Sequence, residues 1–166
     1  MADDIRDFQI SGISIGDSLL DFFSVEEIDN AGDNSYDITK FITRTFLLKE
    51  SDRYEFIQIS FKPSGKKIIH GISGIVTYEN NFQECYKSME KIASELTLLF
   101  PYAEKKDWGK YEVSEGHYFP VTFDFDDLSR AMVACYNWNK ESTAIDSLKV
   151  TLYSEEYQIH LSKQDQ

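Results

Sequence analysis

The sequence of 166 residues has little positive charge. Its 17 lysines and arginines are outnumbered by 29 aspartates and glutamates, and the formal net charge at pH 7 is −12. A nucleic-acid backbone or an anionic membrane surface is bound through clustered lysine and arginine side chains. We therefore expect no nucleic acid among the partners of this protein.

A long apolar run is also missing. No stretch approaches the roughly 20 apolar residues that a membrane-spanning helix needs, so we expect no insertion into a membrane. The first residues, MADDIRDF, are acidic and contain no apolar core of a signal peptide. The sequence as it stands predicts a cytoplasmic protein, whereas a leader replaced by Met-Ala would indicate the periplasm.

Cysteine occurs only twice, at Cys85 and Cys135. No CxxC pair and no series of histidines accompanies them, which argues against a zinc site. Two interpretations remain open. The residues are buried thiols, or they form one disulfide between a central helix and a later strand, which would indicate an oxidising compartment.

Other metal-binding motifs are missing as well. His70, His117 and His160 are scattered along the sequence. The acidic run Asp124, Asp126 and Asp127 could bind a hard cation, but it lacks the glycine and the final glutamate of a calcium-binding EF-hand loop, which favours a solvated turn. The sequence therefore predicts neither a metal site nor a cofactor.

The clearest pattern that is present runs from Tyr78 to Phe100. Apolar residues recur there every three or four positions, which predicts one apolar stripe along a helix. Asn81 can cap its first turn, with Glu84 at the position of a capping-box carboxylate. Pro101 ends the helix. A stripe this wide must lie against a sheet or other helices.

Six segments around this helix alternate in polarity or are rich in β-branched and aromatic residues, which predicts strands. They are residues 39–48, 54–62, 67–77, 118–125, 131–138 and 145–154. The connections between neighbouring segments are too short for parallel crossovers, so we expect two antiparallel meanders.

Two shorter helices are predicted at the ends of the chain. One follows a cap at Asp17 or Ser18, and the other lies within residues 155–163. The predicted fold class is α+β: a two-layer sandwich in which an antiparallel sheet of about six strands packs against the long central helix and the short N-terminal helix. The length predicts a single domain, residues 1–166, with a suggested pseudo-repeat of halves at about 1–100 and 101–166.

One short motif offers a catalytic alternative. Gly16-Asp17-Ser18-Leu19 resembles the nucleophile motif of the GDSL (SGNH) esterases. The resemblance implies that Ser18 attacks an ester carbonyl, with His160 as the candidate base. The family's Gly-x-Asn-Asp block is absent, and Tyr157 stands where its Asp-x-x-His motif has aspartate. The non-catalytic interpretation is a glycine break followed by a helix cap.

Aromatic residues are abundant, at 14% of the chain. Two sets are candidates for a binding patch: Tyr54 with Phe56, and Met132 with Tyr136 and Trp138. Each set alternates with apolar residues that we expect to face the core. If helices cover only one face of the sheet, one set stays partly exposed, as in a protein-binding surface. If helices cover both faces, neither set does.

Two segments carry a wider resemblance, ISGISIGDSLLDFFSVEEI and IIHGISGIVTYENNFQECYKSMEKIASELTLLF. Together they resemble a family of small bacterial proteins to which no function is assigned. More distantly, the opening Gly-x-x-Ile-Gly-x-Ser is similar to modules of the β-lactamase inhibitory protein and of the small outer-membrane lipoprotein A family, which bind other proteins. By analogy of fold, this resemblance implies a non-enzymatic protein-binding or structural module, with another protein as partner.

Overall fold

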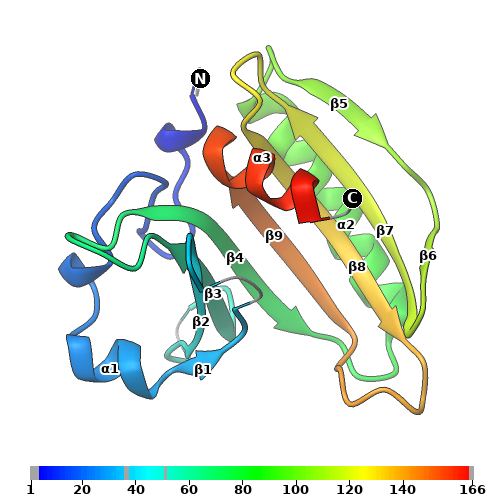
Figure 1. The fold of residues 1–166 in the computed structure, drawn as a ribbon. Coiled ribbons are helices and arrows are strands. Elements are labelled where there is room, and N and C mark those ends of the chain that lie inside the picture. The colour runs from blue at the N-terminus through cyan, green and yellow to red at the C-terminus, as the bar shows by residue number, and fades with distance from the viewer. Residues whose placement is uncertain (1–3, 36–37, 51, 165–166) are drawn as a thin grey trace.

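The computed structural model describes residues 4–35, 38–50 and 52–164 (Figure 1). The strands are β1 (Gly32–Asp33), β2 (Ile42–Leu47), β3 (Phe56–Phe61), β4 (Ile69–Thr77), β5 (Glu104–Asp107), β6 (Tyr111–Val113), β7 (Gly116–Asp124), β8 (Arg130–Trp138) and β9 (Ser147–Tyr153). The helices are α1 (Val25–Asn30), α2 (Phe82–Leu99) and α3 (Glu155–Gln164), with 3-10 turns at Ile5–Asp7 and Leu19–Asp21.

All nine strands belong to one antiparallel sheet in the order β1-β2-β3-β4-β9-β8-β7-β5, and β6 also pairs with β7. The predicted α+β class with an antiparallel sheet is confirmed. The meanders β2–β4 and β7–β9 meet through their last strands, β4 and β9. This junction brings residues 71–77 beside residues 147–153.

The predicted number of about six strands is wrong. The additional strands are the short β1, β5 and β6, and both β5 and β6 are exposed along their whole length. Strands β5 and β6 lie at one edge of the sheet and β1 at the other, and edge strands are often charged and need no apolar side. The polar segment that follows α2 therefore shows no strand periodicity, although it pairs with β7.

Helix α2 covers one face of the sheet and packs on β8 and β9. Its buried residues are Cys85, Met89, Ile92, Ala93 and Leu96. The predicted N-terminal cap is present, because the Asn81 side chain accepts a hydrogen bond from the backbone N–H of Glu84 at 3.4 Å. The helix is thus the central element that the periodicity predicts, but it is one of two long helices, since α3 has 10 residues.

The N-terminal segment covers the same face over β2, β3 and β4, and Phe23 stacks on Phe46 with ring centroids 4.0 Å apart. The predicted helix cap at Asp17 or Ser18 is wrong. Ser18 precedes only a 3-10 turn and makes no side-chain cap bond. Helix α1 begins later, because Ser24 and Glu27 form a reciprocal capping box.

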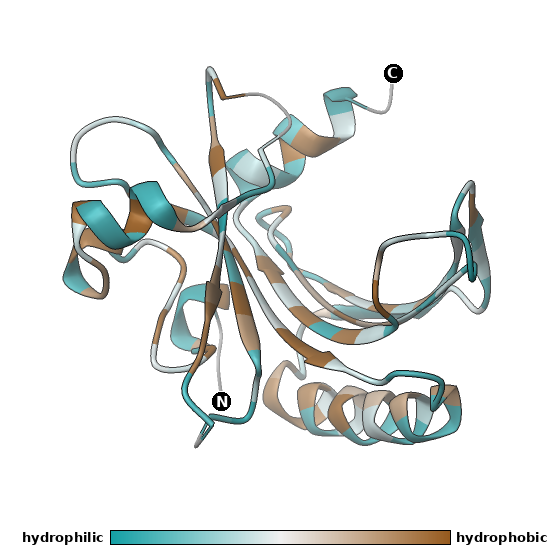
Figure 2. Ribbon diagram, turned by 90° about the horizontal axis from the view of Figure 1, so that it is seen from below, coloured by the Kyte–Doolittle hydropathy of each residue, from teal (hydrophilic) through white to brown (hydrophobic). Residues whose placement is uncertain are grey.

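Helix α3 lies on the opposite face, so the helices do not form a simple two-layer sandwich (Figure 2). The hydroxyl groups of Tyr157 and Ser60 are 2.9 Å apart. Gly71 makes this contact possible, because a Cβ atom there would stand 2.9 Å from the Tyr157 ring. Helix α3 covers part of β3 and β4 and leaves most of β7 and β8 uncovered.

We call the sheet face opposite α2 the open face. Figure 2 shows that β7, β8 and β9 bend away from α2, so the open face is concave there. On these three strands its residues are Tyr118, Pro120, Thr122, Asp124, Arg130, Met132, Ala134, Tyr136, Trp138, Ser147, Lys149, Thr151 and Tyr153.

Candidate functional site

A row of neighbouring aromatic rings crosses the open face. Tyr111 of β6 stands opposite Tyr118 of β7, which stands opposite Tyr136 of β8. The ring centroids are 5.5 Å apart in the first pair and 5.0 Å in the second. Trp138 extends the row at 5.8 Å from Tyr136. Cross-strand aromatic pairs of this kind stabilise a sheet and also present flat apolar surface. We call these four residues the aromatic ladder.

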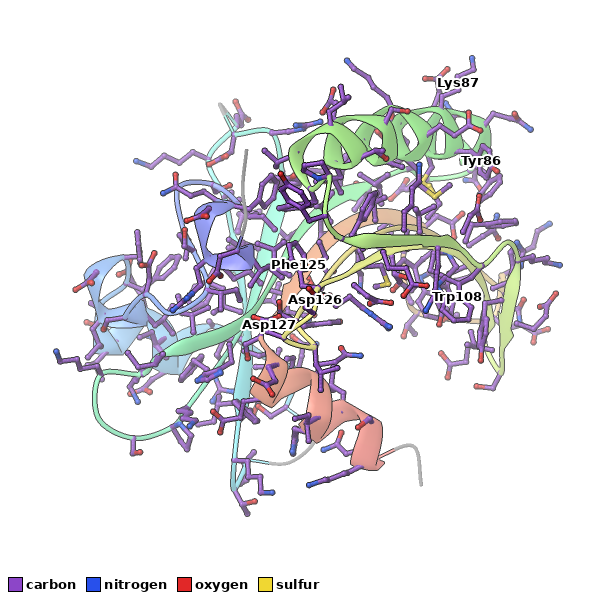
Figure 3. The ribbon with its side chains drawn as sticks, turned by 90° about the horizontal axis from the view of Figure 1, so that it is seen from above. Tyr86, Lys87, Trp108, Phe125, Asp126 and Asp127 are labelled. Atoms are coloured by element: carbon purple, nitrogen blue, oxygen red, sulfur yellow. A yellow bond between two sulfur atoms is a disulfide. The ribbon has the colours of Figure 1, made fainter. Side chains whose placement is uncertain are left out.

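Trp108 adds a fifth ring at the edge of the sheet. Its backbone N–H donates to the Pro120 carbonyl at 3.1 Å, and its indole Nε1 donates to the Thr122 hydroxyl at 3.0 Å. Gly109 follows with φ +62°, which lets the edge strand break between β5 and β6. Figure 3 shows Trp108 on the side of the sheet away from α2. Trp108 and Tyr111 are 49% and 52% exposed, so the ladder is open to solvent at this edge.

Two cavities follow the ladder along β7 and β8. The smaller has a volume of about 200 Å³ and is lined by Trp108, Tyr111, Tyr118 and Met132, among others. The larger has a volume of about 590 Å³ and lies between the β7–β8 turn and α3. Arg130 lines both cavities, so they adjoin on the open face, and we call the two together the hollow.

The ionic groups near Arg130 pair with one another. The Arg130 guanidinium donates to both carboxylate oxygens of Asp124, at 2.5 and 3.2 Å. Lys106 of β5 lies 3.8 Å from Asp124 and 3.5 Å from Glu104. These two cations are matched by Asp124 and Glu104, so this end of the hollow has no unpaired cation, and Asp126 in its lining adds a further carboxylate.

Lys149 differs from those cations, because it rises from the middle of β9 beside the ladder. Its Nζ lies 4.9 Å from the centroid of the Tyr136 ring. Burial lowers the pKa of Lys149 and raises the pKa values of Tyr136 and Tyr153. Thr151, two residues further along β9, and Ser73 opposite it on β4 are hydrogen-bonded to each other at 2.9 Å.

The turn between β7 and β8 presents a leucine in an unusual conformation. Leu128 has φ +68° and is 58% exposed at the larger cavity. Its N–H donates to the Phe125 carbonyl and the Phe125 N–H donates to the Ser129 carbonyl, both at 3.0 Å. Glycine is the usual residue at such a left-handed turn position. An exposed leucine there carries a backbone cost of about 1 kcal/mol that stability alone does not explain.

Comparison of the chain with protein-family models, with curated proteins and with solved structures gives no match. The assignment of a site therefore rests on geometry.

The structure separates the two predicted aromatic sets. Met132, Tyr136 and Trp138 all lie on the open face and contribute to the hollow or the ladder. Tyr54 does not belong to that face, because it is 7% exposed and its ring packs on Gly74. Phe56 is partly buried on β3; by register it lies on the open face, but β4 and β9 separate it from β8 and the ladder.

The structure gives Ser18 and His160 other partners. The Ser18 hydroxyl donates to the Lys66 carbonyl at 2.5 Å. The His160 Nε2 lies 2.9 Å from the Gln164 side-chain nitrogen. A serine nucleophile needs its proton directed at a general base. The hydroxyl of Ser18 instead fastens the N-terminal segment to the loop before β4.

We expect Ser18→Ala to leave the hydrolysis of a short ester such as p-nitrophenyl acetate at the background rate of the wild-type protein. The substitution should lower the free energy of unfolding by about 1 kcal/mol, because one hydrogen bond is lost. Ser162→Ala is the matched control, since the Ser162 hydroxyl also donates to a backbone carbonyl, that of Ile159. Turnover that disappears only in the Ser18 variant would establish the esterase instead.

The sulfur atoms of Cys85 and Cys135 are bonded at 2.10 Å and join α2 to β8. Within residues 4–35, 38–50 and 52–164, no group of three or more His, Cys, Asp and Glu side chains is placed to hold a metal ion. In the same ranges, no helix combines the length and the apolar character needed to cross a membrane.

Sequence reasoning missed Trp108, Tyr118, Arg130 and Lys149 as site residues. Tyr118 precedes Thr122 and Asp124 at alternate positions of one strand, which marks it as facing away from the core. That signal was available in the sequence. The sequence does not predict the place of Lys149 beside Tyr136, because that place depends on the pairing of β9 with β8.

Proposed function

We propose that this protein is a non-enzymatic binding module that holds a segment of another polypeptide in the hollow of its open face. The observation that carries the proposal is the aromatic ladder with Trp108, five rings gathered on one concave sheet face beside the smaller cavity. Aromatic and methionine side chains are enriched in protein-binding surfaces, where they give large contact areas at low entropic cost.

The dimensions of the surface suit a peptide segment. Strand β8 has nine residues and therefore runs about 26 Å along the floor of the hollow. A floor of that length accommodates about eight residues of extended chain. The rim supplies polar groups, such as the ion pair of Arg130 with Asp124, which suits the polar edge of an interface.

Leu128 supports the same proposal independently. It occupies a left-handed turn position at some cost in stability and projects an apolar side chain at the cavity. A partner that covers this side chain gives a reason for its presence.

A random 12-residue peptide library displayed on phage, fused through the peptide C-terminus, tests the proposal. Peptides selected on the wild-type protein should bind a Trp108→Ala/Tyr111→Ala variant about tenfold or more weakly by fluorescence anisotropy, because truncated aromatic hot spots cost about 1–2 kcal/mol or more. Both residues are exposed at the sheet edge, so the variant should keep its fold.

Phe22→Ala is the matched control, because Phe22 is an exposed aromatic residue of the N-terminal segment. The selected peptides should bind this variant as they bind the wild-type protein. The proposal fails if no peptide is selected, or if the selected peptides bind the Trp108/Tyr111 variant unchanged.

A further inference from the structure

Lys149 stands at the centre of the open face. By strand register it lies between Ile75 of β4 and Ala134 of β8. Neither neighbour offers a polar side chain. Its ammonium group reaches over the ring of Tyr136, with 4.9 Å between Nζ and the ring centroid. The lysine therefore lies next to the aromatic ladder, on its β9 side.

The ammonium group has no acceptor among the residues that the structure describes, since no hydrogen bond or ion pair joins it to them. In contrast, Lys62, Lys106 and Lys110 each have a carboxylate oxygen within 4.0 Å. Among partly or fully buried side chains of the described ranges, only Arg44 Nε is an enclosed polar atom without a partner. The Nζ of Lys149 is therefore not enclosed and can be reached from the open face.

A partly buried ammonium group with three unused donors destabilises the folded protein. Burial lowers its pKa, which agrees with this cost. The Tyr136 ring offsets part of the cost but accepts no conventional hydrogen bond. The stability of the folded chain does not explain an unpaired lysine in the middle of the sheet, whereas a ligand that accepts its hydrogen bonds does.

The charges of the surrounding strands show which ligand would complete the site. On the open face of β5, β7 and β8, the cations Arg130 and Lys106 are matched by Asp124 and Glu104. Lys149 is then the one unmatched charge that the described strands present on this face. One positive charge suits one carboxylate, whereas a phosphate group is usually held by several cations or by arginine.

We propose that Lys149 receives the side-chain carboxylate of an aspartate or glutamate in the bound segment. This inference rests on the proposed function. The site lies in mid-strand, with Ser147 and Thr151 on either side along β9, so a chain can continue past it in both directions. That position favours an internal acidic side chain over the carboxyl terminus of a chain.

The ladder adds a second requirement for the ligand. Tyr118 and Lys149 lie two strands apart, which is about 10 Å across the sheet. An extended chain covers that distance in about three residues. The segment should therefore carry an apolar or aromatic residue within about three positions of its acidic residue.

The test compares peptide selections from the C-terminally fused library on the wild-type protein and on a Lys149→Met variant. Methionine matches the length of lysine without its charge. Peptides selected on the wild-type protein should be enriched in aspartate or glutamate near an apolar residue, and this enrichment should be absent from the Lys149→Met selection. The fusion removes the free carboxyl terminus, so any enrichment reports side chains.

Individual selected peptides then give a double-mutant cycle. Changing the acidic residue to its amide should weaken binding to the wild-type protein about tenfold or more and leave binding to Lys149→Met unchanged. Lys149→Arg should retain most of the wild-type affinity. The Lys149→Met variant should unfold at a higher urea concentration than the wild-type protein, which also verifies that it folds.

The outcomes separate the two proposals. Peptides that depend on the hollow could be selected without acidic enrichment, or could bind Lys149→Met as they bind the wild-type protein. In either case the hollow binds polypeptide, but Lys149 is not a carboxylate site. If acidic dependence arises only in synthetic peptides with a free C-terminus, the proposed side-chain recognition is wrong. If no peptide depends on the hollow, both proposals fail.

Discussion

Reduction of the Cys85–Cys135 disulfide should lower the free energy of unfolding by about 4 kcal/mol. The two cysteines are 50 residues apart in the sequence, so the bond closes a long loop in the unfolded chain. Closing such a loop removes conformational entropy from the unfolded state, and the effect grows with loop length. The bond also holds α2 against β8, the strand that carries Tyr136 on its other face.

Urea unfolding of the oxidised and the reduced protein measures this difference. A Cys85→Ala/Cys135→Ala variant without reductant should resemble the reduced protein, which separates loss of the bond from effects of the reductant. Thiol titration of the unfolded chain should detect no thiol before reduction and two afterwards. Two thiols before reduction, or equal stability in both states, would support the other sequence interpretation, in which both cysteines are buried thiols.

The sequence was most informative where local spacing determines structure. Helix α2 extends over Phe82–Leu99, inside the stretch predicted from apolar periodicity, and it has the predicted Asn81 cap. Each of these features depends on residues three or four positions apart. The six longer strands were found for the same reason, since alternation along one strand needs no knowledge of its neighbours.

Features that depend on distant segments were not predictable. The residues of β5 and β6 form strands because β7 offers them hydrogen-bonding groups, and their own sequence shows no alternation. Helix α3 lies on the opposite face from α2 because Gly71 and Ser60 leave a place for Tyr157. Neither relation has a counterpart in short-range sequence patterns.

The residues of the candidate site also differ in whether local sequence patterns predict them. Met132, Tyr136 and Trp138 were identified from alternation on β8 alone. Tyr54 was placed on the wrong face, because it precedes β3 and does not follow the alternation of that strand. Lys149 can be recognised as a site residue only when β9 is known to lie between β4 and β8.

Gly74→Ala should lower the free energy of unfolding by about 2–3 kcal/mol, within the range for overpacking of a core. A Cβ atom at Gly74 would stand 2.7 Å from two atoms of the Tyr54 ring, closer than such atoms approach in proteins. The ring is buried and cannot move into solvent without exposing apolar surface. The φ angle of Gly74 is not positive, so the cost arises from packing and not from backbone strain.

Gly32→Ala provides the control, because its nearest neighbour, Thr45 Cβ, would be 3.8 Å away and the residue is exposed. Its effect should stay within about 0.5 kcal/mol. A Tyr54→Leu/Gly74→Ala double variant replaces the ring by a smaller side chain and should recover part of the stability lost by the glycine substitution. The interaction free energy between the two substitutions should be about 1 kcal/mol or more. If Gly74→Ala costs no more than Gly32→Ala, the Tyr54 ring does not pack on Gly74. Tyr54 would then be available at the surface, and the binding patch would have to be sought on β3 as well as on β8.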